Sequence, residues 1–250
     1  MTSPHSAAAS GSWLSIETSS EACSVALRIN AETRERFELA PRRHAELILP
    51  MVSSLLAEAE LALGQLDGIA FGRGPGSFTS LRIGIGVVQG LAWGQDLPVV
   101  PVSSLAAVAQ TAIDQLSVRP GPEPEIRRVC VAMDARMKEV YHANFEVDSD
   151  GLVTLSGGEQ VCLPANVRSD ARVQSAAEVC AAGNGFERYP ELEKLGGELG
   201  LCLPECWPRA VAVSRLADKW MEHNSPLPAD QAQPVYIRNQ VAVKTQDRVV

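Results

Sequence analysis

Several features that define common protein classes are missing from this sequence. No run of apolar residues reaches the roughly 18 to 20 that a membrane-spanning helix needs. The opening stretch, MTSPHSAAASGS, contains neither the basic segment nor the apolar segment of a secretory signal. Basic residues total 22 against 30 acidic ones, which gives a net charge of −8. We therefore expect a cytoplasmic globular protein that does not hold nucleic acid by itself, since phosphates are bound chiefly by lysine and arginine.

Metal-binding and nucleophilic patterns are missing as well. The six cysteines form no CxxC pair, and no two of the four histidines lie four residues apart or in HExxH. Ser77 lies in GPGSF and not in a GxSxG elbow. We interpret the cysteines as reduced thiols, and we expect neither a zinc site nor a hydrolase.

What is present is an alternation of strand and helix patterns, which indicates an α/β protein. The predicted strands span 13–17, 22–29, 33–39, 66–72, 97–102, 127–134, 139–147 and 151–165. The predicted helices span 44–60, with a kink or a start near Pro50; 80–94, capped by Thr79; Ser103 or Ser104 to about Gln115; and 209–223. A docked segment is predicted at 234–239. The strand pair after residue 126 repeats the opening pair, so the pattern favours two related halves.

The same pattern predicts where the two halves begin and end. Small and polar residues at both ends predict tails, and a stretch rich in proline and glycine predicts a linker. The predicted division is a tail at 1–11, an N-terminal half at 12–118, a linker at 119–126, a C-terminal half at 127–240 and a tail at 241–250.

The most informative motif is GRGPGSFTSLRIGIG at residues 72–86. Glycines around Pro75 form a strand-to-helix turn whose backbone amides could hold an anion, or they only turn the chain tightly. Neither the Walker A pattern nor the dinucleotide-binding pattern is present. The sequence IETSS just after the first strand is a second loop of this kind. In an ATPase of such architecture an aspartate and a glycine would be expected where Glu17 and Ser19 stand, so a plain hairpin turn is the alternative.

The helix after the glycine loop carries Gly86, Gly90 and Gly94 on one face. Each glycine inside a helix costs about 0.8 to 1 kcal/mol relative to alanine. The bare face must therefore serve a close contact, either with another part of this chain or with a partner. Spacing alone leaves both interpretations open.

Five segments together closely resemble the TsaB family, also called YeaZ, of bacterial tRNA threonylcarbamoyladenosine biosynthesis. They are IETSSEACSVAL (16–27), RRHAELILPMV (42–52), GRGPGSFTSLRIGIGVVQGLA (72–92), MDARMKEVY (133–141) and PVYIRN (234–239). The resemblance covers nearly the whole chain from residue 13. It implies an actin-like ATPase superfold, also called the ASKHA or sugar kinase/Hsp70-like fold, with two related α/β halves. One departure is Ser80, where the family commonly has glycine.

The resemblance also implies a role without catalysis. The sister protein TsaD shares the fold and transfers threonylcarbamoyl from threonylcarbamoyl-AMP to the N6 of the adenosine beside the anticodon, in tRNAs that read codons beginning with A. TsaD carries two metal-binding histidines where this chain has Ser104 and Val108. We therefore expect a partner subunit of TsaD, with the ATPase TsaE joining the complex, and tRNA contacted only through that complex. An independent ATP-dependent enzyme or peptidase of the same superfold is the alternative.

The resemblance assigns site residues in two groups. The partner-binding residues are His44, Leu47, Ile48, Met51, Leu55, Arg82, Gly86, Val87 and Gly90. A vestigial nucleotide-side loop comprises Glu17, Thr18, Ser19, Gly74, Gly76 and Ser77. No cofactor of its own and no metal are expected, and a weakly bound nucleotide at the subunit junction and a homodimer of the chain alone are left open.

Overall fold

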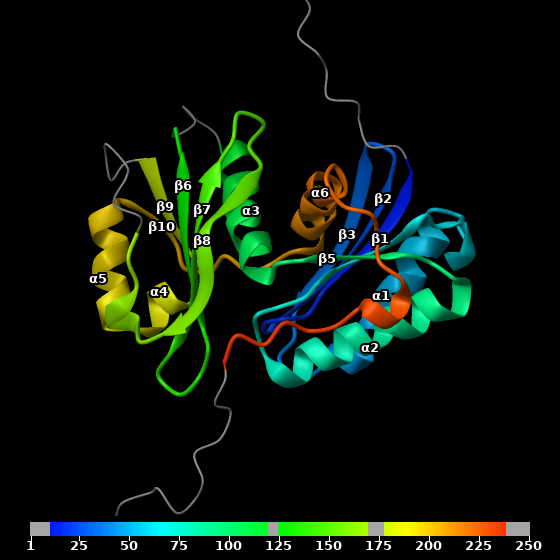
Figure 1. The fold of residues 1–250 in the computed structure, drawn as a ribbon, viewed down its shortest axis with the longest axis horizontal. Coiled ribbons are helices and arrows are strands. Elements are labelled where there is room, and N and C mark those ends of the chain that lie inside the picture. Colours follow the sequence, from blue (N-terminus) through cyan, green and yellow to red (C-terminus); the bar gives the residue numbers. More distant parts are fainter. Residues whose placement is uncertain (1–10, 120–124, 170–177, 239–250) are drawn as a thin grey trace, which may run out of the picture.

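The computed structural model describes residues 11–119, 125–169 and 178–238, and these form two five-stranded mixed sheets (Figure 1). In the first sheet the strand order is β3 (Glu32–Leu39), β2 (Ala22–Ile29), β1 (Ser12–Glu17), β4 (Gly68–Gly72) and β5 (Val99–Val102). The second sheet follows the order β8 (Val153–Cys162), β7 (Val140–Val147), β6 (Arg128–Asp134), β9 (Val179–Ala182) and β10 (Leu201–Leu203).

The two sheets have the same topology. In each, the first three strands in chain order form an antiparallel meander, the fourth pairs in parallel with the first, and the fifth pairs in parallel with the fourth. The second half therefore repeats the first, strand for strand. The predicted α/β superfold of two related halves is confirmed.

Strand sequences follow from the position of each strand in its sheet. The central strands β1 and β6 are buried along almost their whole length and read WLSIE and VCVAM at their buried positions. Helices cover both faces of these strands, which favours apolar residues, and the polar exceptions in β1 are the buried Ser15 and Glu17. The edge strand β3, ETRERFEL, is mostly polar, with Phe37 and Leu39 as its two apolar residues, and remains partly exposed.

The helices lie in three layers around the two sheets (Figure 1). The outer face of the first sheet is covered by α1 (His44–Glu58) and α2 (Phe78–Gln95), and the outer face of the second by the short α4 (Gly185–Arg188) and α5 (Pro190–Leu199). Between the sheets lie α3 (Ser104–Ser117) and α6 (Ala210–Met221). The two central helices are exchanged between the halves. The helix α3 follows the first sheet in the chain but packs on the second, and α6 follows the second sheet but packs on the first.

This exchange joins the halves through one central core. The core contains residues of both sheets and both central helices, among them Val100 and Val131 of the strands and Val108 and Val213 of the helices. Breaking the halves apart would expose all of these side chains to water. The boundary predicted at 119–126 lies largely outside the described residues, and the division by chain order remains a prediction.

Most predicted elements lie within two residues of the observed ones, but two details of the helices differ. The helix α1 begins at His44 with Pro50 inside it, so the predicted start near Pro50 is wrong. Ser77, not Thr79, is the residue that precedes α2. Ser103 caps α3 as predicted, since its Oγ accepts a hydrogen bond from Ala106 N at 3.1 Å.

Among the described residues no helix combines the length and the apolar character that crossing a membrane requires. The predicted tails at 1–11 and 241–250 lie outside the described residues, apart from Gly11.

Candidate functional site

The loop after β1 is organised around the buried carboxylate of Glu17. Its Oε1 accepts a hydrogen bond from Ser19 N at 2.5 Å, and its Oε2 accepts one from Ser104 Oγ at 2.8 Å. Ser104 Oγ in turn accepts a hydrogen bond from Gly74 N at 3.2 Å. Burial raises the pKa of Glu17 above its ordinary value, although its hydrogen bonds lower it. The Glu17 carboxylate therefore accepts hydrogen bonds from Ser19 N and Ser104 Oγ. Ser19 N is for this reason not available to an anion from outside the chain.

The glycines near this loop are explained by close packing. A Cβ on Gly72 would lie 2.9 Å from Ser104 Oγ and closer still to the carboxylate of Glu17. One on Gly76 would lie 2.6 Å from Ser19 Cβ and closer to the Ser19 carbonyl oxygen. One on Gly84 would overlap the hydroxyl of Thr18. The tight-turn interpretation of the glycine loop therefore has a specific cause, which is the approach of residues 17–19.

The predicted nucleotide-side residues do come together in space. Ser77 N donates a hydrogen bond to Ser19 O at 2.7 Å, and Thr18 Oγ1 donates one to Ser80 O at 3.0 Å. Gly74 has a φ of +96°, which explains the need for glycine there. The two loops that the sequence placed on one side of the fold thus form a single hydrogen-bonded unit. Within it, Ser19 N is bonded to Glu17 and Ser77 N to Ser19 O, so neither of these two amides is free to bind a phosphate.

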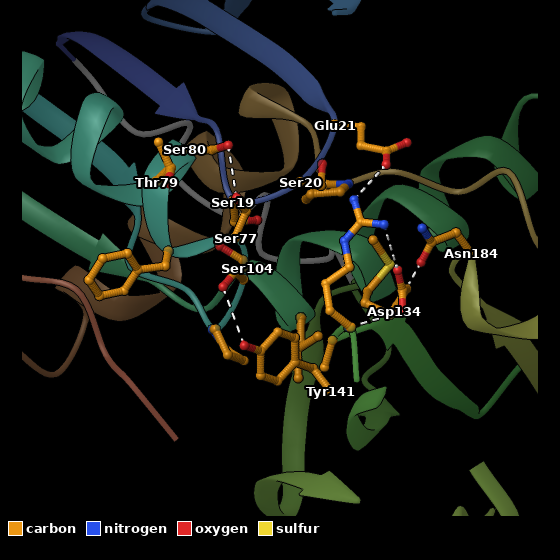
Figure 2. Close-up of a pocket in the computed structure, with 18 of the residues that line it drawn as sticks. Ser19, Ser20, Glu21, Ser77, Thr79, Ser80, Ser104, Asp134, Tyr141 and Asn184 are labelled. Atoms are coloured by element: carbon orange, nitrogen blue, oxygen red, sulfur yellow. Dashed lines mark hydrogen bonds and ion pairs between the residues drawn. The ribbon is translucent and has the colours of Figure 1, made fainter. Parts of the chain in front are cut away.

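A cleft of about 1230 Å³ opens above this unit, between the two halves (Figure 2). Its lining is rich in hydroxyl groups from the first half, including Ser20 and Thr79, and is completed by Asp134, Tyr141 and Asn184 of the second. Tyr141 donates a hydrogen bond across the cleft to Gly76 O at 3.4 Å.

The two positions matched to the sister protein's histidines have other surroundings. Ser104 is buried in the Glu17 hydrogen-bond network, and Val108 is buried in the core between the sheets. Throughout the part of the chain that the structure describes, no three histidine, cysteine, aspartate or glutamate side chains are placed to hold a metal ion.

Three of the predicted partner-binding residues cannot contact a partner through their side chains. His44, Ile48 and Leu55 are buried, and His44 Nε2 lies 3.2 Å from Ala22 O. Their spacing marks the face of α1 that packs on the first sheet. The apolar stripe predicted as an interface is, at these positions, the helix's contact with its own core, and the prediction is corrected there.

The other predicted partner-binding residues are accessible to different degrees. Leu47, Met51 and Val87 are half-buried against the same core, whereas Arg82, Gly86 and Gly90 are exposed. A Cβ built on Gly86, Gly90 or Gly94 meets nothing within 4 Å. Among the described residues no part of this chain uses the bare glycine face.

Sequence reasoning missed the large apolar side chains that are exposed on α1 and α2. Trp93 is 73% exposed, Leu49 48% and Phe78 46%. Trp93 follows Gly86 by seven residues, about two helical turns, so the sequence contained the signal that it shares the glycine face. We call Phe78, Arg82, Gly86, Gly90 and Trp93 of α2 the outer helix face.

The predicted docked segment at 234–239 is confirmed over its described residues. Val235 N donates a hydrogen bond to Arg73 O at 2.8 Å, and Arg82 Nε donates one to Tyr236 Oη at 2.9 Å. The guanidinium of Arg82 also lies over the ring of Phe78, at 3.9 Å from its centroid. The segment therefore fixes the N-terminal end of the outer helix face.

Comparison with known proteins adds independent evidence. The family model described as "TsaD: tRNA N6-adenosine threonylcarbamoyltransferase" matches residues 37–195. The chain is 38% identical to a tRNA threonylcarbamoyladenosine biosynthesis protein TsaB from Escherichia coli K12, over 92% of this chain and 96% of that protein. It is 37% identical to the TsaB of Haemophilus influenzae, over 92% and 95%. A solved structure of YeaZ from Pseudomonas aeruginosa is similar, with a TM-score of 0.80, 38% identity and coverage of 90% and 99%.

Proposed function

Because the chain belongs to the TsaB family of tRNA threonylcarbamoyladenosine biosynthesis proteins, we propose that it is a non-catalytic subunit that binds TsaD through the outer helix face. In this proposal TsaD transfers threonylcarbamoyl from threonylcarbamoyl-AMP to N6 of the adenosine beside the anticodon. The ATPase TsaE joins the complex, and tRNA is contacted only through it, in the cytoplasm.

The exposed glycines of α2 are the observation that carries the proposal. Interior glycine costs about 0.8 to 1 kcal/mol each, and no described residue packs against Gly86, Gly90 or Gly94. A helix without side chains on one face allows a second helix to approach closely. The cost is offset if that second helix belongs to a partner.

The composition of the same face supports a protein interface. Arg82 is the only charged residue among the 18 of α2. Helices exposed to water usually carry a charged face, whereas the centres of interfaces are poor in charge and rich in aromatic residues and arginine. Phe78, Arg82 and Trp93 match that composition and offer anchors around the glycines.

The loop around Glu17 supports a role without chemistry of its own. Ser19 N and Ser104 Oγ both donate to the Glu17 carboxylate, and Ser104 and Val108 offer no imidazole to a metal. A nucleotide held weakly at the junction of the two subunits is compatible with the proposal, because that site would lie outside this loop. A homodimer of the chain alone would use the same outer helix face.

The large cleft between the halves is the observation that favours the alternative, an independent ATP-dependent enzyme or peptidase. The purified chain would then hydrolyse ATP or a peptide without partners. Loss of that activity in Glu17→Ala would favour the alternative over the subunit proposal.

The decisive test uses two glycines on different helices. Gly90→Leu fills the outer helix face, whereas Gly197→Leu fills an equally open position on α5. We expect Gly90→Leu to weaken TsaD binding at least about 100-fold in calorimetry, because a bulky side chain prevents close approach of the partner. Gly197→Leu should bind as the wild type does, and both variants should melt at or above the wild-type temperature, because leucine favours the helix more than glycine does.

Two outcomes would contradict the proposal. One is equal binding by the two variants. The other is a reconstituted reaction with TsaD, TsaE and tRNA that forms threonylcarbamoyladenosine equally well without this chain.

A further inference from the structure

Ion pairs join the two halves at the mouth of the cleft (Figure 2). Glu21 lies in the turn between β1 and β2, in the first half. Its Oε1 lies 3.1 Å from Arg136 Nη2 and 3.2 Å from Arg188 Nη2, and both arginines belong to the second half. One carboxylate of the first half therefore faces two guanidinium groups of the second.

The two arginines are held in place by Asp134. Its Oδ2 lies 2.7 Å from Arg188 Nη1 and 3.4 Å from Arg136 Nη1, and its Oδ1 accepts a hydrogen bond from Tyr189 Oη at 2.7 Å. The Asp134 side chain is only 6% exposed. Because a nearly buried carboxylate orients both guanidinium groups, Glu21 meets a preformed pair and not two freely moving side chains.

The hairpin tip that presents Arg136 has an unusual backbone. Arg136, Met137 and Lys138 have φ values of 62°, 54° and 61°, and none of them is glycine. This backbone conformation is unfavourable for residues other than glycine and persists only where the surroundings impose it. The strained tip therefore needs contacts that hold it.

A second contact holds the tip from the opposite side. Arg238, at the end of the docked C-terminal segment, places Nη2 2.5 Å from Glu139 Oε2 and Nη1 3.6 Å from Met137 Sδ. The same segment is bonded to the first half through Val235 N and Arg73 O. The tip of the second half is thus held between the Glu21 turn and the C-terminal segment, both fixed to the first half.

We propose that this protein closes its own cleft: Glu21 supplies the anion that bridges the two facing loops, and Arg238 locks the same hairpin tip from the other side. Two loops that face each other across a cleft can be drawn together by an anionic ligand that contacts both. Here a carboxylate of the chain takes that position. The halves then form one rigid unit with no ligand bound, and this inference does not depend on the identity of any partner.

The test measures amide hydrogen exchange at the hairpin tip, where Ala135 N is bonded to Glu139 O and Glu139 N to Arg136 O. Glu21→Gln keeps the shape of the side chain and removes its charge. We expect exchange of these amides to become about three- to ten-fold faster, the range that follows from losing partly exposed ion pairs. Glu187→Gln, on the exposed surface of α4, makes the same charge change as a control and should leave exchange at the tip unchanged.

A second pair of variants keeps the test decisive if Glu21→Gln folds poorly. Arg136→Gln changes a side chain that is 69% exposed, so it should fold and show the same faster exchange. Glu139→Arg should also loosen the tip, and adding Arg238→Glu should restore it, since the pair is then rebuilt with reversed charges.

Three results would overturn the proposal. The first is wild-type exchange rates in both Glu21→Gln and Arg136→Gln, and the second is no rescue in the charge-reversed pair. The third is that the tip amides of the wild type exchange as fast as those of Glu21→Gln and slow down only when millimolar ATP or pyrophosphate is added. A ligand, and not Glu21, would then bridge the loops.

Discussion

Two groups of glycines in one short stretch of chain have opposite surroundings. Gly72, Gly76 and Gly84 leave room for the Glu17 loop, and a Cβ at any of them would overlap a neighbouring atom. Gly86, Gly90 and Gly94 follow Gly84 on α2, and a Cβ at any of these three would meet nothing within 4 Å. The first group makes the fold possible, whereas the second destabilises α2 without a benefit inside the described chain.

The difference separates internal packing from docking. A glycine required by packing should tolerate no added atom, and a glycine required by a partner should tolerate one in the isolated chain but not in the complex. The helix thus changes its role within one turn, from Gly84, which faces the Glu17 loop, to Gly86, which faces solvent.

The largest effect is expected at the inner glycines. Gly76→Ala places a Cβ against the backbone carbonyl of Ser19, which cannot move without breaking its hydrogen bond from Ser77 N. We expect the free energy of unfolding to fall by about 2 to 3 kcal/mol. Urea denaturation of this variant should be compared with Gly158→Ala in β8, where the added Cβ meets nothing. Equal stability of the two variants would show that the loop has room which the structure does not display.

A smaller effect of opposite sign is expected at the outer glycines. Gly86→Ala and Gly90→Ala should each raise the free energy of unfolding by about 0.8 to 1 kcal/mol, because alanine favours the helix and nothing opposes its Cβ. Thermal and urea unfolding of the isolated chain would measure the gain. A loss of stability in either variant would mean that these glycines serve internal packing, and the comparison with the inner group would fail.

The pH dependence of stability tests the buried carboxyl group of Glu17, which lies against Gly72. The pKa of Glu17 is raised in the folded chain above the ordinary 4.5, chiefly by burial. The folded state then binds more protons than the unfolded state above that pH, so stability from this group is greatest at low pH and decreases as the pH rises through the folded pKa.

The Glu17→Gln variant should remove that decrease. Its urea midpoint should change less than the wild-type midpoint when the pH is raised from about 5 to 8. Parallel pH profiles in the two proteins would show that Glu17 is not the group responsible.

The smallest effect is expected at Ser80, which lies between Gly76 and Gly84 of the first group. Its hydroxyl is paired with Ser77 Oγ at 3.0 Å, near the start of α2. Ser80→Gly, which gives the residue that the TsaB family commonly has, should lower the free energy of unfolding by about 0.5 kcal/mol through lost helix propensity. Chemical denaturation would measure it, and a loss above about 1.5 kcal/mol would mean that the hydroxyl pair contributes more than an ordinary hydrogen bond.

The sequence by itself determined most elements of this fold and their order, but it did not predict β9, α4, α5 and β10. Apolar runs bounded by turn residues located the strands, the repeat of the opening hairpin indicated two related halves, and five motifs identified the family. These features depend on local periodicity and on short segments, so they can be read without knowing what packs against what.

Tertiary structure alone decided which face of each element is used. Helical spacing showed that Ile48 and Leu55 share a face, but only the packed sheet revealed that this face belongs to the core and that Leu49 remains exposed. The same holds for the glycines of the stretch 72–94, for the exchange of α3 and α6, and for the ion pairs of Glu21. All of these depend on contacts between residues far apart in the chain, and local sequence does not determine such contacts.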